Sequence, residues 1–217
     1  MDCIDDVEMI KALSGVSKAP KQQRDDKLLT TFSVGLKPTC FQRRVLNLML
    51  KVTNYTYNWC VYLVNEMNVS PMQIHLQKIV CKTNSKDVDP AYRLANDDWF
   101  YQNKMTAIKT TACRNFCTSY HIARKKKFEL RKTRDVSECI GQGSIGIQKL
   151  FAKLLTTKDK CHGHRSKHVV IMNDIFGGPL RINQKVDRIP QFDHDFKIMK
   201  RANGRFVLQL PCDPSWT

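Results

Sequence analysis

The segment KLLTTFSVGLKPTCFQ, residues 27–42, predicts a β-strand that runs directly into an α-helix. Residues 28–37 show the period-2 alternation of a half-buried strand. Pro38 ends this strand because it has no amide hydrogen for a further ladder bond. Thr39 and Gln42 then form a T-x-x-Q capping box, in which each side chain binds the other residue's backbone amide. We therefore expect a strand followed by a helix that begins after Thr39.

Helical periodicity continues well beyond this capping box. Apolar and aromatic side chains recur every three or four residues as far as about Glu66, which predicts a long amphipathic helix. Ser70 and Pro71 supply a cap and a proline at the first helical position, and so predict a shorter helix that ends near Cys81. The apolar stripe of the long helix comprises Val45, Leu48, Met49, Val52, Tyr55, Trp59, Tyr62 and Leu63.

Two more helices are expected in the middle of the chain. Residues 97–127 carry a buried stripe at Ile108, Ala112 and Phe116 and end in four consecutive cations, which a helix C-terminus favours. Residues 146–158, GIQKLFAKLLTTK, place their apolar side chains on one helical face and predict another amphipathic helix.

Strand patterns return after Gly163 and complete the predicted fold. VVIMNDI at 169–175, PLRIN at 179–183 and the pair DFKIMK and RFVLQLP are separated by turn residues. Asn203 and Gly204 predict a type I′ hairpin, in which both positions need positive φ. We therefore expect an α+β protein in which a small antiparallel β-barrel is interrupted by a long helical insertion. The expected division is a mobile tail over residues 1–26, a barrel over residues 27–38 and 163–213, and a helical lobe with a basic linker over residues 39–162.

The charge of the chain favours a polyanionic partner. There are 36 Lys and Arg against 20 Asp and Glu, a formal net charge of +16. The excess is uneven, since residues 121–168 contain 13 basic and 4 acidic side chains. Each cation beside a phosphate releases condensed counterions, so a long basic stretch interleaved with aromatic residues favours nucleic acid. The alternative is a solvated basic face without a ligand.

Several features predict a location inside the cell. No stretch approaches the length of about 18 uncharged apolar residues that a membrane helix needs, and the N-terminus MDCIDDVEMI is acidic where a secretory signal is basic. The nine cysteines are odd in number and irregularly spaced, which favours reduced thiols. We expect an intracellular protein that does not contact a membrane, and a nuclear one in a eukaryotic or viral host.

Three patterns with known chemistry lack their usual context here. GQGSIG, residues 141–146, matches G-x-G-x-x-G without the βαβ unit of dinucleotide-binding proteins, so we expect a flexible linker. Cys161, His162 and His164 are candidate zinc ligands, but no paired C-x-x-C accompanies them, and we expect neither a metal nor another cofactor. No cluster of carboxylates predicts a two-metal nuclease site, so we expect no catalytic residues.

The segment LKPTCFQRRVLNLMLKVTNYTYNWCVYLVNE, residues 36–66, resembles the N-terminal helix-turn-helix region of TnpB proteins of bacterial insertion sequences and of their eukaryotic and viral relatives, the Fanzors. Two later segments resemble the same family in the same order. DWFYQNKMTAIKTTACRNFCTSY is similar to a recognition-lobe helix, and FKIMKRANGRFVLQLP is similar to the hairpin that closes the wedge domain. The resemblance covers about residues 28–212, and its matching residues include Leu36, Pro38, Thr39, Gln42, Val45, Leu46, Tyr57, Asn58 and Val61.

Members of this family are RNA-guided DNA endonucleases. Their wedge and recognition parts bind the guide-RNA scaffold and read a short duplex motif, and a RuvC-like domain after the wedge hairpin cuts the DNA. The resemblance implies a wedge-like barrel, a recognition-like helical insertion and a chain that is the binding half, ending where the nuclease domain begins. It implies an endonuclease only if a RuvC-like domain is supplied elsewhere.

The expected partner is structured RNA, duplex DNA or both. Tyr57 and Asn58 match the family's motif, with core packing as the alternative for Tyr57 and Trp59. Gln102 and Lys104 lie in the segment that resembles the recognition helix and are candidates for duplex contact. The basic run supplies candidate phosphate contacts, with a solvated face or a nuclear import signal as the alternatives: Arg124, Lys125, Lys126, Lys127, Arg131, Lys132 and Arg134.

Other functions stay open at this point. A helix-turn-helix regulator would act without RNA and insert the helix after Thr39 and another beyond Lys51 into a DNA groove. The chain is alternatively an inactive remnant of a mobile element, or an interaction protein whose basic stretch binds an acidic partner. Copurifying RNA favours the RNA-guided class, whereas salt-sensitive binding of RNA-free protein to a defined duplex favours the regulator.

Overall fold

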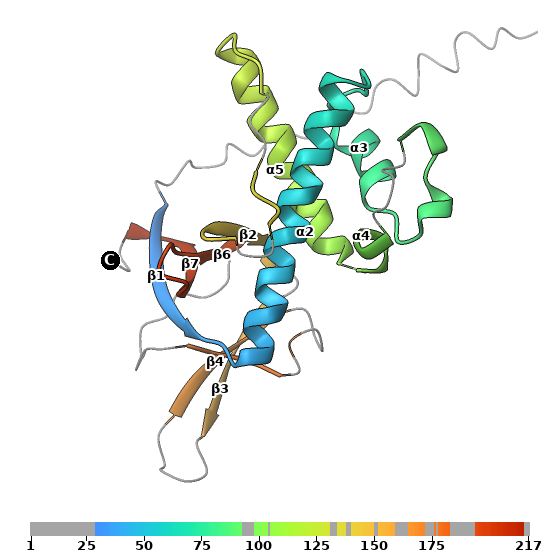
Figure 1. The fold of residues 1–217 in the computed structure, drawn as a ribbon. Helices are drawn as coiled ribbons and strands as arrows, with labels where there is room; N and C mark the ends of the chain where they lie inside the picture. The colour runs from blue at the N-terminus through green and yellow to red at the C-terminus, as the bar shows by residue number, and fades with distance from the viewer. Residues whose placement is uncertain are drawn as a thin grey trace, which may run out of the picture.

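The computed structural model describes residues 29–92, 98–103, 105–130, 134–137, 140–149, 152–158, 165–171, 176, 178–182 and 194–214 (Figure 1). The expected tail over residues 1–26 lies outside the described residues. The helices are α2 (Cys40–Asn65), α3 (Gln73–Val80), α4 (Asp98–Gln102) and α5 (Thr106–Lys125), with short 3-10 turns η1 (Ser85–Asp87) and η2 (Pro90–Tyr92). The strands are β1 (Thr30–Lys37), β2 (Gly143–Ile147), β3 (Ala152–Lys158), β4 (Arg165–Ile171), β5 (Leu180–Ile182), β6 (Phe196–Lys200) and β7 (Phe206–Cys212).

One antiparallel sheet contains all seven of these strands, in the order β2-β6-β7-β1-β5-β4-β3. The central strand β1 pairs with β7 from Thr30 opposite Cys212 to Gly35 opposite Val207. Its last residues then pair with β5, with Leu36 opposite Ile182. The predicted α+β class is therefore confirmed.

The sheet is open, so the predicted closed barrel is wrong. Among the described residues no pairing joins the two edge strands, β2 and β3. The β3–β4 hairpin projects away from α3, α4 and α5 instead of returning toward β2 (Figure 1).

The helical insertion lies between β1 and β2 along the chain, as predicted. Helices α2 and α5 pack against each other, and both contact β2. The core joins the two parts because Leu46 and Leu50 of α2 are buried in one cluster with Ile145 of β2 and Leu208 of β7. None of the helices in the described ranges is both long enough and apolar enough to cross a membrane.

The start of α2 has the predicted capping box. Gln42 Oε1 accepts from the Thr39 amide at 3.0 Å, and Thr39 Oγ1 accepts from the Gln42 amide at 3.2 Å. The same Gln42 side chain donates to the carbonyl oxygens of Phe176 at 3.4 Å, Gly178 at 3.3 Å and Pro179 at 3.3 Å. It therefore also attaches the first turn of α2 to the segment that leads into β5.

Two predictions for the helices are wrong. Ser70 and Pro71 do not cap the next helix, because α3 begins at Gln73 after Met72 without a side-chain cap bond. The helix predicted over residues 97–127 is divided into α4 and α5. At this break the Asn103 side chain donates to the Trp99 carbonyl oxygen and so ends α4.

The helix predicted over residues 146–158 is also wrong, because these residues contribute to β2 and β3. Ile145 and Ile147 are buried while β2 pairs with β6, so tertiary packing overrides the helical pattern. Gly146 allows a close approach, since a Cβ there would lie 2.7 Å from Thr111 Cγ2 of α5. The predicted flexible linker is therefore partly strand. Strand β2 pairs with β6, and β3 pairs with β4. Both partners lie in residues 163–213, which the sequence predicts to form the barrel.

The β6–β7 hairpin is confirmed, but its predicted type I′ turn is wrong. Gly204 has a φ of +74°, whereas Asn203 is not among the described residues with positive φ. The Gly204 amide donates to the Arg201 carbonyl at 2.8 Å, and the Arg201 amide donates to the Arg205 carbonyl at 2.9 Å. This is a three-residue loop, in which a type I turn is followed by one left-handed residue.

A buried lysine lies between α4 and α5. The Lys109 side chain is 0% exposed, and its Nζ donates to the Phe100 carbonyl oxygen at 2.8 Å. The same Nζ lies 3.9 Å from the centroid of the Phe100 ring. Burial lowers the pKa of Lys109 from 10.5 to about 8.

This pKa predicts a specific dependence of stability on pH. Between about pH 8 and 10.5 the folded protein holds Lys109 neutral, whereas the unfolded chain still binds its proton. Since the unfolded state then binds more protons, the free energy of unfolding should rise with pH by about 3 kcal/mol relative to Lys109→Met. Urea unfolding of both proteins from pH 7 to pH 10.5 measures this difference. A pH-independent difference would contradict the depressed pKa.

Candidate nucleic-acid interface

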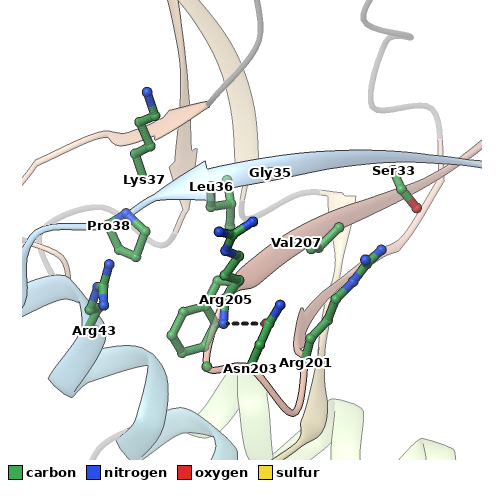
Figure 2. Close-up of a pocket in the computed structure, with 12 residues that line it drawn as sticks. Ser33, Gly35, Leu36, Lys37, Pro38, Arg43, Arg201, Asn203, Arg205 and Val207 are labelled. Carbon is green, nitrogen blue, oxygen red and sulfur yellow. Dashed lines mark hydrogen bonds between the residues drawn. The ribbon is translucent and has the colours of Figure 1, made fainter.

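A hollow of about 530 Å³ lies where the end of β1, the first turn of α2 and the loop between β6 and β7 meet. We call it the hairpin pocket and define it by its four cationic lining residues, Lys37, Arg43, Arg201 and Arg205. All four side chains are exposed. Figure 2 shows Arg43 extending from α2, and Arg201 and Arg205 from the hairpin loop, with Arg205 between the other two in this view.

The fold explains how residues so distant in sequence meet in this pocket. Alternation along β1 buries Val34 and Leu36 and leaves Ser33 and Lys37 exposed. The pocket is lined by the residues from Gly35 to Lys37 and by Ser33, and the Lys37 side chain extends to the other side of the β1 ribbon from the arginines (Figure 2). Gly35 has no side chain to fill this space. Helix α2 follows β1 after a two-residue connection, so Arg43 lies one turn from the end of the strand.

The hairpin loop holds its two arginines in place from the other side. The backbone bonds between residues 201 and 205 close the loop, and Asn203 Oδ1 accepts from the Arg205 amide at 3.1 Å. Both arginines therefore start from a fixed backbone. Arg205 extends toward β1 near Leu36, whereas Arg201 extends toward Ser33 (Figure 2).

The electrostatics of the hairpin pocket favour an anion. No acidic residue is among the described residues that line it. None of its four cations forms an ion pair with a described residue. Guanidinium groups form strong charge-assisted hydrogen bonds with phosphate oxygens, and arginine suits planar, bidentate recognition of such groups. Several cations without a carboxylate thus provide a site for one or more phosphates.

Three of the sequence-predicted site residues come together, but as an internal cluster. The Tyr57 ring lies between Phe116, at 5.6 Å between centroids, and the Arg134 guanidinium, whose Cζ is 3.7 Å from the ring centroid. Asn58 Nδ2 donates to the Arg134 carbonyl at 2.8 Å, and Asn58 Oδ1 accepts from the Arg134 amide at 2.7 Å. Burial lowers the pKa of Arg134, although arginine stays charged at neutral pH.

Asparagines on one face of α2 attach the segment before β2 to that helix. Asn54 Nδ2 donates to the Asp135 carbonyl at 2.7 Å, and Asn65 Nδ2 donates to the Leu130 carbonyl at 3.2 Å. The exposed fractions of Tyr57 and Trp59 are 4% and 2%, which confirms their core position. The Tyr57-Asn58 pair is therefore engaged in holding Arg134.

The other predicted contacts lie apart from this cluster. Gln102 is exposed on α4, just before α5 begins, whereas Arg124, Lys125, Lys126 and Lys127 are exposed at the opposite end of α5. Because α5 has 20 residues, its ends are about 30 Å apart. The remaining candidates lie outside the described residues: Lys104, Arg131, Lys132, Cys161, His162 and His164.

The sequence analysis missed the hairpin pocket, although two local signals point to it. Two arginines, at positions 43 and 44, directly follow the capping box, and the hairpin loop reads RANGR, with an arginine on each side of the turn. What sequence inspection does not reveal is that β1 pairs with β7 and so brings these two signals together.

Two comparisons of the sequence with known proteins found no match. No protein-family model matches the chain, and no curated protein matches it. Within the described ranges, no group of three or more His, Cys, Asp or Glu side chains is placed to hold a metal ion.

Removing the Asn58 side chain tests its structural role. Asn58→Ala should lower the free energy of unfolding by about 1–3 kcal/mol, because both polar backbone groups of Arg134 lose their partner. Urea unfolding measures this change. Gln102→Ala, at an exposed position, is the control and should change the free energy by less than about 0.5 kcal/mol. Equal stability of the two variants would contradict the role of Asn58.

Proposed function

We propose that this chain binds nucleic acid through its phosphates, with the hairpin pocket as the principal contact. The observation that carries this proposal is the meeting of Arg43, Arg201 and Arg205 around one hollow without a described carboxylate (Figure 2). Like charges around the empty pocket repel one another, and a bound phosphate backbone would neutralise them and remove this repulsion.

The rest of the charge distribution supports a long polyanion over a single small anion. The whole chain carries a net charge of +16, and the four exposed cations at the end of α5 form a second basic region. Each phosphate that a cation neutralises releases counterions, so separated basic regions add their contributions along one nucleic acid. Phosphate contacts of this kind position the ligand without reading its sequence.

The finer proposal is that the ligand is structured RNA, duplex DNA or both, as for the wedge and recognition parts of a TnpB or Fanzor protein. Its support is the resemblance over about residues 28–212, together with the order of a strand, an inserted set of helices and a final hairpin. In such a protein a guide RNA selects the sequence, while the protein holds phosphates and nucleic-acid shape. An inactive remnant of the same family would share these contacts.

The alternative of an RNA-free helix-turn-helix regulator receives no support from α2. That alternative expects one helix after Thr39 and another beyond Lys51. Helix α2 instead runs unbroken from Cys40 to Asn65, so Lys51 lies in its interior. The segment that resembles a helix-turn-helix region is therefore largely one helix.

The salt dependence of binding tests the proposed contact. The logarithm of the binding constant for a structured RNA or a DNA duplex should fall linearly with the logarithm of the salt concentration. Arg201→Ala combined with Arg205→Ala should reduce the magnitude of the slope by about 2, because two phosphate contacts are lost. Fluorescence anisotropy at 50 to 200 mM salt measures both quantities.

A matched variant separates the pocket from net charge. Lys78 and Lys82 are exposed cations that do not line the hairpin pocket. Replacing both with Ala removes the same charge and should leave the slope nearly unchanged. If the lysine pair and the arginine pair weaken binding equally, the pocket is not the principal contact.

A further inference from the structure

A second basic hollow, of about 430 Å³, lies where the last turns of α2 and α5 meet. We call it the α5 hollow and define it by its cationic lining residues, Arg124 and Lys127. Neither of them forms an ion pair with a described residue. Glu129 is the one carboxylate among the described residues that line it. Since Lys125 and Lys126 are exposed between the two lining cations in the sequence, positive charge is in excess at this end of α5.

The backbone holds Lys127 in an unusual conformation. Its φ is +56°, in the left-handed region where the residue after a helix is usually glycine. The Lys127 amide donates to the Arg124 carbonyl oxygen at 3.1 Å, and the Phe128 amide donates to the Ala123 carbonyl oxygen at 3.1 Å. These two bonds form a Schellman motif at the end of α5. A side chain at this position has a steric cost that glycine avoids, and such costs cluster at functional sites.

Stabilisation of the helix end does not account for this lysine. Cations near a helix C-terminus interact favourably with the helix dipole, but Arg124 and Lys125 already lie in the last turn of α5. Glycine in place of Lys127 would remove the steric cost and leave those two charges. A ligand that binds the ammonium group explains why a lysine is present.

Helix α2 sets the spacing between the α5 hollow and the hairpin pocket. Arg43, in its first turn, lines the hairpin pocket, and Asn65, its last residue, lines the α5 hollow. About six helical turns separate these two residues, so they lie about 33 Å apart along the axis and on nearly the same side of it. Figure 1 shows the first turn of α2 beside the end of β1 and its last turns near those of α5.

We infer that the hairpin pocket and the α5 hollow bind phosphates one helical turn apart on the same face of a nucleic-acid duplex. This inference rests on the proposed nucleic-acid binding and adds the form of the ligand. A DNA duplex presents the same face once per turn, every 34–36 Å or about 10 base pairs, which is close to the spacing of the two sites. A single strand would lose conformational entropy when held extended between them, whereas a duplex is already rigid over this length.

The test uses two DNA duplexes, of about 6 and about 12 base pairs, each closed at one end by a linker without phosphates. At about 3.4 Å per base pair, their lengths are about 20 and about 41 Å, so only the longer duplex reaches both sites. Arg124→Ala combined with Lys127→Gly should reduce the magnitude of the salt slope by about 2 on the longer duplex, because two phosphate contacts are lost. The slope on the shorter duplex should stay nearly unchanged, since that duplex binds at the hairpin pocket alone.

Two further variants control for folding and for net charge. Lys127→Gly alone suits the left-handed turn, so it should not lower the free energy of unfolding in urea. It should still reduce the slope on the longer duplex by about 1, which keeps the test valid if Arg124→Ala disturbs α5. Lys78→Ala combined with Lys82→Ala removes two cations that line neither site and should change neither slope.

The outcomes separate this inference from the proposed function. An equal reduction of the slope on the two duplexes, or no reduction on either, would overturn the one-turn spacing and leave the proposed function standing. Binding to single strands but not to duplexes would do the same. Failure of the wild type to bind any nucleic acid would overturn the proposed function and this inference together.

Discussion

The antiparallel pairing of β1 with strands from the far end of the chain is the constraint on which the rest of the structure depends. Thr30–Gly35 pair with β7, and the last two residues of β1 pair with β5, so β1 is the central strand. All the helices among the described residues lie in the connection between β1 and β2. The entropic cost of closing a loop grows only slowly with its length, so a long insertion is tolerated once the core is buried.

The same pairing creates the candidate interface. It places the β6–β7 loop beside the end of β1, and the short connection after β1 places the first turn of α2 there as well. Gln42 reinforces this arrangement, because its side chain caps α2 and also binds three carbonyl oxygens near the start of β5. The position of Arg43 beside the hairpin pocket thus follows from the fold.

Local patterns predicted those features that depend on neighbouring residues. The strand before Pro38, the Thr39–Gln42 capping box, the long helix and the final hairpin are all confirmed. Predictions failed where distant contacts decide the structure. Residues 146–158 have a helical apolar pattern, but pairing with β6 places Gly146 and Ile147 in β2, and pairing with β4 makes Ala152–Lys158 the strand β3. Tyr57 and Asn58 matched a family motif, yet their side chains contact Arg134 inside the protein. The hairpin pocket is formed by residues 37–43 together with residues 201–205. Local sequence patterns do not predict that these two distant segments lie close together.

The most direct measurement is the nucleic acid that accompanies the protein from cells. The 217-residue protein and a variant with Arg201→Glu and Arg205→Glu would be purified in parallel at moderate salt, and the nucleic acid in each would be sequenced. The account predicts a discrete RNA with the wild type and little of it with the variant, because the substitutions reverse two charges of the hairpin pocket. Wild-type protein without nucleic acid, or equal recovery with the two proteins, would contradict it.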